Sequence, residues 1–176
     1  MTSAAEAVAG EPGPMARPGR GGQTQGQSAR LLLFEIGASR FGLPEGQVVE
    51  LLAAMAMTPL PHAPSIVEGI IDIRGRVVPV LDVRRRFRLA PKPLAPSDHL
   101  IVANAGGRRV ALRVDRACEL VTIARSAIVD AQAIASGTEY LAGIAALPDG
   151  LVLIQDLGAF LSQAEAEALA AALEAR

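Results

Sequence analysis

The chain has 176 residues, 51 % of them hydrophobic but only 3 % aromatic, so we expect a sizeable core built from Val, Leu, Ile and Ala. The net charge of −1 gives no general attraction to nucleic acid or an anionic membrane, and the single cysteine, Cys118, excludes an internal disulfide and any multi-cysteine metal site. The longest apolar run, Leu51–Met57, is far shorter than the ~20 residues of a membrane span, and the N-terminus lacks the apolar stretch of a signal peptide, so we expect a cytoplasmic protein.

Residues 1–29 are rich in Gly, Pro, Ala, Gln and Ser and show no hydrophobic periodicity, which predicts a disordered tail. Two strand-like runs, Leu31–Ile36 and Arg40–Leu43, then flank a short Gly-Ala-Ser turn and predict a hairpin. Pro44 suits a first helical position, and a short helix is expected to follow it with an apolar face formed by Val48, Val49, Leu51 and Leu52. Three prolines then make 58–65 a constrained connector that is extended near Pro59.

The next stretch, Gly69–Asp82, has two Ile- and Val-rich runs around an Arg74-Gly75-Arg76 turn, which predicts a second hairpin. Pro79 lies inside the second run and has no N–H to donate, so we expect that strand to be an edge strand or to be bulged there. A short amphipathic segment, Val83–Leu89, follows, and the three prolines of 90–97 predict a linker.

After the linker the pattern of short strands starts again. Residues 126–138 are mixed in character and are expected to form a loop. A C-terminal helix is predicted over 162–176, because Ser162 and Glu165 fit a capping box ahead of strong helix formers. The strands expected in this part are His99–Ala103, Arg108–Val114, Ala117–Ile123, Tyr140–Leu147 and Leu151–Ile154.

The two parts of the chain form an internal repeat. Matching positions in the same order are Arg40 with Arg109, Leu43 with Leu112, Glu50-Leu51 with Glu119-Leu120, Gly69-Ile70 with Gly143-Ile144, Val78 with Val152, and Asp82 with Asp156. The repeat predicts a mainly β fold of two pseudo-equivalent small barrels, since closure removes the exposed edges of short strands. Arg74 falls on Pro148, so the repeat itself does not require this arginine.

Few residues indicate chemistry. His62 and His99 lie beside proline-rich segments without a nucleophile motif, and Cys118 sits in an apolar run that favours a buried small hydrophobe over a reactive thiolate. The cluster Arg84–Arg88 is a candidate phosphate-binding patch, although a short helix with solvated arginines explains it better. Glu50 and Arg74 carry opposite charges in the same half, and an ion pair between them is an open question at this point. We expect no catalysis and no cofactor.

The run E-G-I-I-D-I-R-G-R-V-V-P-V-L-D-V-R-R-R-F resembles the signature of CheW-like chemotaxis coupling proteins. The resemblance extends to the L-P-x-x-x-V-x-E-L block at 43–51, to Val114-Asp115 and to T-E-Y-L-x-G at 138–143, so it covers 31–161. Two positions depart from the family pattern: Asp72 stands where an Asn is usual, and Arg116 stands where a Gly is usual.

The resemblance implies two five-stranded SH3-like barrel subdomains, interleaved over 30–161, with a C-terminal helix over 162–176. It implies a non-catalytic adaptor that joins the cytoplasmic tips of chemoreceptors to a CheA-type histidine kinase at membrane-attached arrays. Carried over by position, the receptor-binding candidates are Val48, Glu50, Gly69, Arg74 and Leu120, which would line a groove for a receptor helix. No kinase-binding residue is assigned. The alternatives are a coupling protein of a related pathway that controls surface motility or development, and a nucleic-acid-binding barrel that uses Arg84–Arg88.

Overall fold

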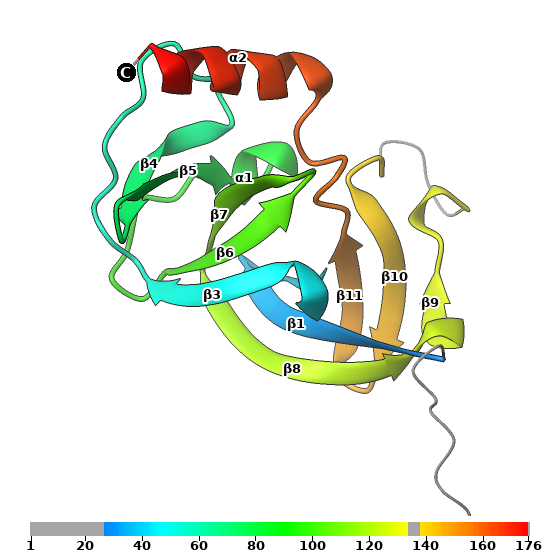
Figure 1. Ribbon diagram of the computed structural model, residues 1–176. Coiled ribbons are helices and arrows are strands. Elements are labelled where there is room, and N and C mark those ends of the chain that lie inside the picture. Colours follow the sequence, from blue (N-terminus) through cyan, green and yellow to red (C-terminus); the bar gives the residue numbers. More distant parts are fainter. Residues whose placement is uncertain (1–26, 134–137, 176) are drawn as a thin grey trace, which may run out of the picture.

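A computed structural model of the protein describes residues 27–133 and 138–175 (Figure 1). The strands are β1 (Ser28–Ile36), β2 (Ser39–Pro44), β3 (Val48–Ala53), β4 (Val67–Ile73), β5 (Arg76–Asp82), β6 (His99–Ala105), β7 (Arg108–Val114), β8 (Arg116–Ala124), β9 (Ile128–Val129), β10 (Leu141–Leu147) and β11 (Gly150–Gln155). The helices are α1 (Val83–Arg86) and α2 (Gln163–Glu174), and 3₁₀ turns cover Glu45–Gln47, Arg125–Ala127 and Ala131–Ala133. Most of the predicted disordered tail lies outside the described residues, but Ser28 and Ala29, which were counted with the tail, belong to β1. None of the helices described is long and apolar enough to cross a membrane.

The strands form two sheets, and each sheet combines strands from both parts of the repeat. The first has the order β8-β1-β2-β11-β10-β9, and the second has the order β3-β6-β7-β5-β4. The sequence repeat equates β1, β2, β3, β4 and β5 with β6, β7, β8, β10 and β11. Under this exchange the second order becomes β8-β1-β2-β11-β10, so both sheets have the same topology. The predicted mainly β fold of two pseudo-equivalent units is confirmed, and each unit is completed by a strand pair from the other half of the chain.

The two sheets are closed in the same way, by a segment that follows β3 or β8. In the second sheet, Thr58 and Ile70 exchange two backbone hydrogen bonds of 2.9 and 2.8 Å, which link the chain beyond β3 to β4. In the first sheet, β9 pairs with β10 in the corresponding place. This two-residue strand lies in the segment predicted as a loop, and it gives the first sheet a sixth strand that the sequence did not indicate.

The predicted helix after Pro44 is wrong. Only the 3₁₀ turn Glu45–Gln47 is helical, and Val48–Ala53 is strand β3, paired with β6. Its residues alternate between half-buried and exposed, but the exposed positions Val49 and Leu51 are also apolar. The hydrophobic pattern therefore lacks the period of two that normally distinguishes a strand from a helix.

The strand that contains Pro79 is interior, not an edge strand, because β5 lies between β4 and β7. Pro79 pairs with Ile70, whose backbone N–H and C=O both bond to Thr58. In an antiparallel ladder this geometry means that the backbone of Pro79 faces away from β4 and towards β7. The β5–β7 pairing begins only at Val80, one residue later, so the missing N–H leaves no ladder bond broken.

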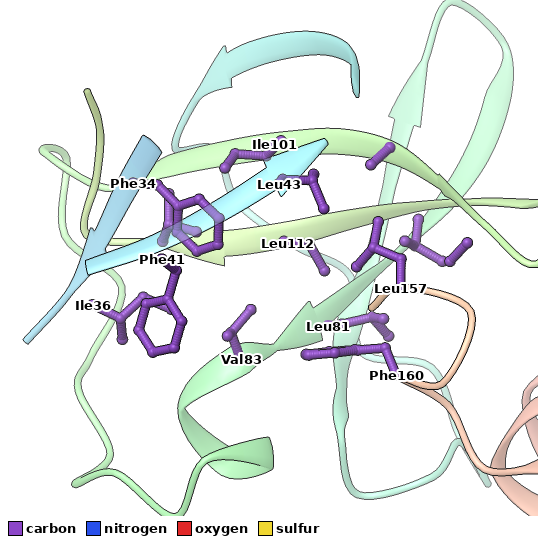
Figure 2. Close-up of a cluster of buried hydrophobic side chains, with 14 of the residues drawn as sticks. Phe34, Ile36, Phe41, Leu43, Leu81, Val83, Ile101, Leu112, Leu157 and Phe160 are labelled. Carbon is purple, nitrogen blue, oxygen red and sulfur yellow. The ribbon is translucent and has the colours of Figure 1, made fainter. Parts of the chain in front are cut away.

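The largest core cluster lies between the two sheets and includes aromatic rings among its aliphatic side chains (Figure 2). Phe34 and Phe41 stack with ring centroids 5.6 Å apart, and Phe87 packs 5.1 Å from Phe41 and 6.4 Å from Phe160. The core is built from Val, Leu, Ile and Ala as expected, except that Phe34, Phe41 and Phe160 are also buried. All four phenylalanines of the chain gather where the sheets meet, and large rings fill that junction with few side chains.

The C-terminal helix α2 is confirmed together with its capping box, in which Ser162 and Glu165 cap each other. Leu169 and Ala172 bury its inner face against Leu60 and Ile70. Arg86 of α1 stabilises the first turn of α2, because it pairs there with Glu165 at 2.7 Å. The Arg86 guanidinium also lies 4.5 Å from the Tyr140 ring centroid.

A network of charged side chains fixes the proline-rich linker 90–97 to the barrels. Lys92 Nζ donates to Asp98 (2.6 Å) and to Asp115 (2.9 Å), while Arg84 also pairs with Asp115. Arg113 donates to the Lys92 carbonyl at 2.9 Å. Burial alone would raise the pKa of Asp115, but the Gly37 amide, Lys92 and Arg84 outweigh it, and the pKa lies below the ordinary aspartate value.

This lowered pKa gives a pH dependence of stability. A carboxyl with a depressed folded-state pKa stabilises the protein above its unfolded value, about 3.9, and that contribution is lost as the pH falls through the folded-state pKa. Asp115→Asn is therefore expected to lower the free energy of unfolding more at pH 7 than at about pH 3. Urea unfolding at the two pH values measures the difference. An equal effect at both would contradict the assignment of the lowered pKa to Asp115.

Candidate functional site

The β4–β5 hairpin tip projects Arg74 into solvent. Arg74 and Gly75 have φ of 53° and 79°, as a two-residue loop with φ > 0 at both central positions requires. Such loops favour Asn, Asp or Gly, and a non-glycine residue in left-handed conformation costs about 1–2 kcal/mol. Asp72 Oδ1 offsets part of this cost by accepting the Gly75 N–H at 2.7 Å. The asparagine that is usual at position 72 in the signature offers the same side-chain oxygen, so this departure preserves the turn.

Glu50 of β3 and Arg74 of the β4–β5 turn form an ion pair. Arg74 Nη2 lies 3.7 Å from Glu50 Oε2, and the Arg74 side chain is 85 % exposed whereas that of Glu50 is 23 % exposed. The ion pair left open by the sequence therefore exists. Because it is long and largely solvated, it adds little stability, and the arginine remains available for a partner.

The other receptor-binding candidates have different environments. Val48 is half-buried and packs on the main core, whereas Leu120 is 51 % exposed on β8 of the first sheet. Gly69 is buried, and a Cβ at this position would lie 2.8 Å from the Thr58 carbonyl oxygen. Gly69 thus serves the backbone closure of the second sheet. Of the five candidates, the structure brings Glu50 and Arg74 into direct contact.

Sequence reasoning missed an exposed apolar strip on the outer face of β3. Val49 and Leu51 are exposed there, Met55 is exposed just beyond the strand, and Leu51 (46 %) is the repeat counterpart of Leu120. Strand β3 is also the edge of its sheet. The misassigned helix concealed this strip, because a helix would have turned Leu51 towards the core.

The arginine cluster 84–88 is mostly used inside the molecule. Arg84 pairs with Asp115, Arg85 donates to the Ser65 carbonyl at 2.8 Å, and Arg86 pairs with Glu165. The expectation of simply solvated arginines was wrong for Arg84 and Arg86, whose side chains are only 12 % and 10 % exposed. These pairs also remove most of the free charge on which a nucleic-acid interpretation depends.

The environments of Cys118 and Arg116 do not favour a catalytic role. Cys118 is half-buried, and burial raises the pKa of its thiol, which disfavours the nucleophilic thiolate. Arg116, the second departure from the signature, lies on the surface and donates to both carboxylate oxygens of Glu35 at 3.2 and 3.1 Å. Within 27–133 and 138–175, no three His, Cys, Asp or Glu side chains are grouped to hold a metal ion.

A family model described as the CheW-like domain matches residues 30–165. The chain belongs to the CheW-like family. It is 29 % identical over 146 residues to the chemotaxis protein CheW of Klebsiella aerogenes, which covers 82 % of this chain and 87 % of that protein. It is 38 % identical over 73 residues to protein FrzA of Myxococcus xanthus, covering 42 % of this chain and 46 % of that protein.

A solved CheW structure has the same fold. The scaffolding protein TtCheW of Thermoanaerobacter tengcongensis superposes with a TM-score of 0.72 at 25 % identity, over 78 % of this chain and 94 % of that one. CheW-like proteins are non-catalytic scaffolds, and this chain is accordingly a coupling adaptor and not an enzyme. An adaptor acts through the surfaces that bind its partners, and the exposed hairpin tip and the outer face of β3 are the candidates for such surfaces.

Proposed function

We propose that this CheW-like protein couples the cytoplasmic tips of chemoreceptors to a CheA-type histidine kinase, in the cytoplasm at membrane-attached receptor arrays. The proposal rests on the family assignment and on the likeness to a solved scaffolding protein. It requires no cofactor and no nucleic acid.

The receptor contact in this proposal is the Glu50–Arg74 pair. The observation that carries it is the left-handed backbone of Arg74, because a turn that needs only φ > 0 is served better by asparagine or glycine. An arginine in this conformation, held beside Glu50 and pointing to solvent, is suited to fix the orientation of a receptor helix by charge. Val48 and Leu120 would supply apolar contacts to the same helix. Gly69 would contribute indirectly, by allowing the Thr58 segment to close the second sheet.

A second surface is needed for the kinase. The apolar outer face of β3, with Val49 and Leu51, is the strongest candidate, since an exposed edge strand with apolar side chains favours contact with another protein. A β-barrel regulatory domain of the kinase would be a suitable occupant.

A coupling role in a related pathway for surface motility or development is the second candidate. It is favoured by the match to FrzA, a relative that does not carry the CheW name. The identity of the receptor and kinase that bind this chain distinguishes the two candidates, and co-purification from the native lysate would reveal both.

Arg74→Glu is expected to weaken binding to a chemoreceptor cytoplasmic fragment by about tenfold or more, because reversing a charge at a contact costs at least about 1.4 kcal/mol. The free energy of unfolding should stay within about 0.5 kcal/mol of the wild type, since the side chain is exposed. Co-sedimentation with the receptor fragment measures binding, and urea unfolding measures stability.

Arg88→Glu is the matched control. Arg88 is also an exposed arginine with positive φ (54°), but it lies after α1, away from the hairpin tip. Equal receptor binding by wild type and Arg74→Glu would refute the role of Arg74, and equal losses in both variants would show a general charge effect.

A further inference from the structure

The parallel strand pairing begins two repeat positions later in the second sheet than in the first. In the first sheet, Leu153 of β11 takes part in the parallel pairing with β2. The repeat places Pro79 at the position of Leu153, and there the β5–β7 pairing stops at Val80 and Ala111. The backbone of Pro79 faces β7 but carries no N–H, and no β5–β7 pair is formed at Pro79 or before it.

Two hollows lie beside this part of β5. One hollow of about 450 Å³ is lined by Arg76, Val77, Val78, Asn104, Gly107 and Arg109. A second hollow of about 300 Å³ shares Val77 and Arg109 with the first and extends past Pro79 and Arg108 to Leu173 and Glu174 at the end of α2. Together they form a groove in which arginines lie beside the apolar side chains of Val77, Pro79 and Leu173, and we call it the arginine cleft.

The side chains of the three arginines of the cleft, Arg76, Arg108 and Arg109, have no ion pair or hydrogen bond among the described residues. Arg108 Nη1 is shielded from solvent and lacks any acceptor there. Glu174, at the far end, makes no ion pair with them either. Three guanidinium groups on one groove repel one another, and a buried donor without an acceptor is costly.

The corresponding hollow of the first sheet shows that this charge is not imposed by the fold. It is lined by Ser39, Arg40, Asp149, Gly150 and Leu151, among others. Arg40 is the repeat counterpart of Arg109, and it is neutralised by Asp149. The position of Asp149 is taken by Gly75 in the second sheet, and that of Arg76 is taken by Gly150 in the first. One hollow therefore neutralises itself, and the other concentrates positive charge.

We propose that the arginine cleft binds an acidic segment of a partner protein in extended conformation. Carboxylates would accept hydrogen bonds from Arg76, Arg108 and Arg109, and an apolar side chain between them would lie on Val77 and Leu173. Guanidinium groups pair with carboxylates in bidentate geometry, which relieves both the repulsion and the unsatisfied Arg108 donor. The apolar side chains beside the arginines favour a peptide over a small anion, and the net charge of −1 disfavours a nucleic acid. This surface shares no residue with the receptor-binding candidates.

The test uses the full chain and a fluorescein-labelled peptide of about ten residues that alternates glutamate with valine, since alternate side chains of an extended chain share one face. Fluorescence polarisation at low ionic strength measures its binding. The double variant R76Q/R109Q is expected to weaken binding by about tenfold or more, because it removes two charged hydrogen-bond donors. The control variant R40Q neutralises the counterpart arginine of the other sheet and should change binding by less than about twofold.

Matched ligands separate the outcomes. A peptide with glutamine in place of glutamate should not bind, and thermal unfolding must show that R76Q/R109Q is folded. Absence of binding by the glutamate peptide to wild type would overturn the proposal, as would equal losses in R76Q/R109Q and R40Q. If pyrophosphate or duplex DNA binds more tightly at the same arginines, the proposal of a peptide ligand is overturned and the cleft is a phosphate-binding site. None of these results depends on receptor binding, so the proposed coupling function is tested separately.

Discussion

Asp98→Ala is expected to lower the free energy of unfolding by about 3–5 kcal/mol, the usual cost of removing one partner from a buried charge network. Asp98 is only 1 % exposed. Its carboxylate accepts from Lys92 Nζ at 2.6 Å and from the Ala95 N–H at 3.1 Å, and it lies 3.9 Å from Arg113 Nη1. Alanine would leave the buried Arg113 with less compensating charge and release the linker from β6 and β7.

Urea unfolding at neutral pH measures this effect, and Asp130→Ala provides the control. Asp130 also accepts a nearby backbone N–H, that of Gln132 at 2.9 Å, but it is exposed. Its loss should cost no more than about 1.5 kcal/mol, the upper range for a single hydrogen bond. Similar costs in the two variants would mean that the Asp98 network contributes no more than a local turn.

The individual hairpins could be predicted because their signals are local. Residues 31–43, 69–82 and 99–114 each contain two apolar runs around a glycine-containing turn, and all three fold as predicted. The sequence repeat also predicted two equivalent units. The exchange of the β1–β2 and β6–β7 hairpins between the sheets could not be predicted in this way, because it depends on contacts between segments far apart in the chain.

In the candidate site too, local features could be predicted from the sequence, whereas contacts between distant segments could not. The Arg74-Gly75 turn follows from its residues, whereas the distance from Arg74 to Glu50 depends on how the barrel closes. The cluster 84–88 was misread because the partner of Arg86, Glu165, lies on another element 79 residues later. Pro79 was expected to mark an edge strand or a bulge, but β5 is interior and the irregularity of this hairpin lies between Val67 and Gly69 of β4. The proline is tolerated because its backbone faces β7 just before the β5–β7 pairing begins.

Gly69→Ala is expected to lower the free energy of unfolding by about 1–3 kcal/mol, the usual cost of overpacking. The new Cβ would lie 2.8 Å from the Thr58 carbonyl oxygen and 3.1 Å from Met57 Cβ. The Thr58 segment cannot simply move away, because that oxygen accepts the Ile70 N–H at 2.8 Å and so closes the sheet. Gly143→Ala should have a similar cost, since its Cβ would lie 2.9 Å from the Val129 carbonyl oxygen in the other unit.

Gly46→Ala is the control for this effect, because a Cβ there meets no atom within 4 Å, and its stability should change by less than about 1 kcal/mol.

The comparison also separates two roles for Gly69, which the family resemblance places at the receptor surface. If Gly69 acts through the fold, the receptor binding of Gly69→Ala will follow its folded fraction and return on cooling or on addition of an osmolyte. Binding by Arg74→Glu would not return under these conditions. A Gly69→Ala variant with wild-type stability and no receptor binding would instead place the Gly69 backbone in the interface, against the burial seen here.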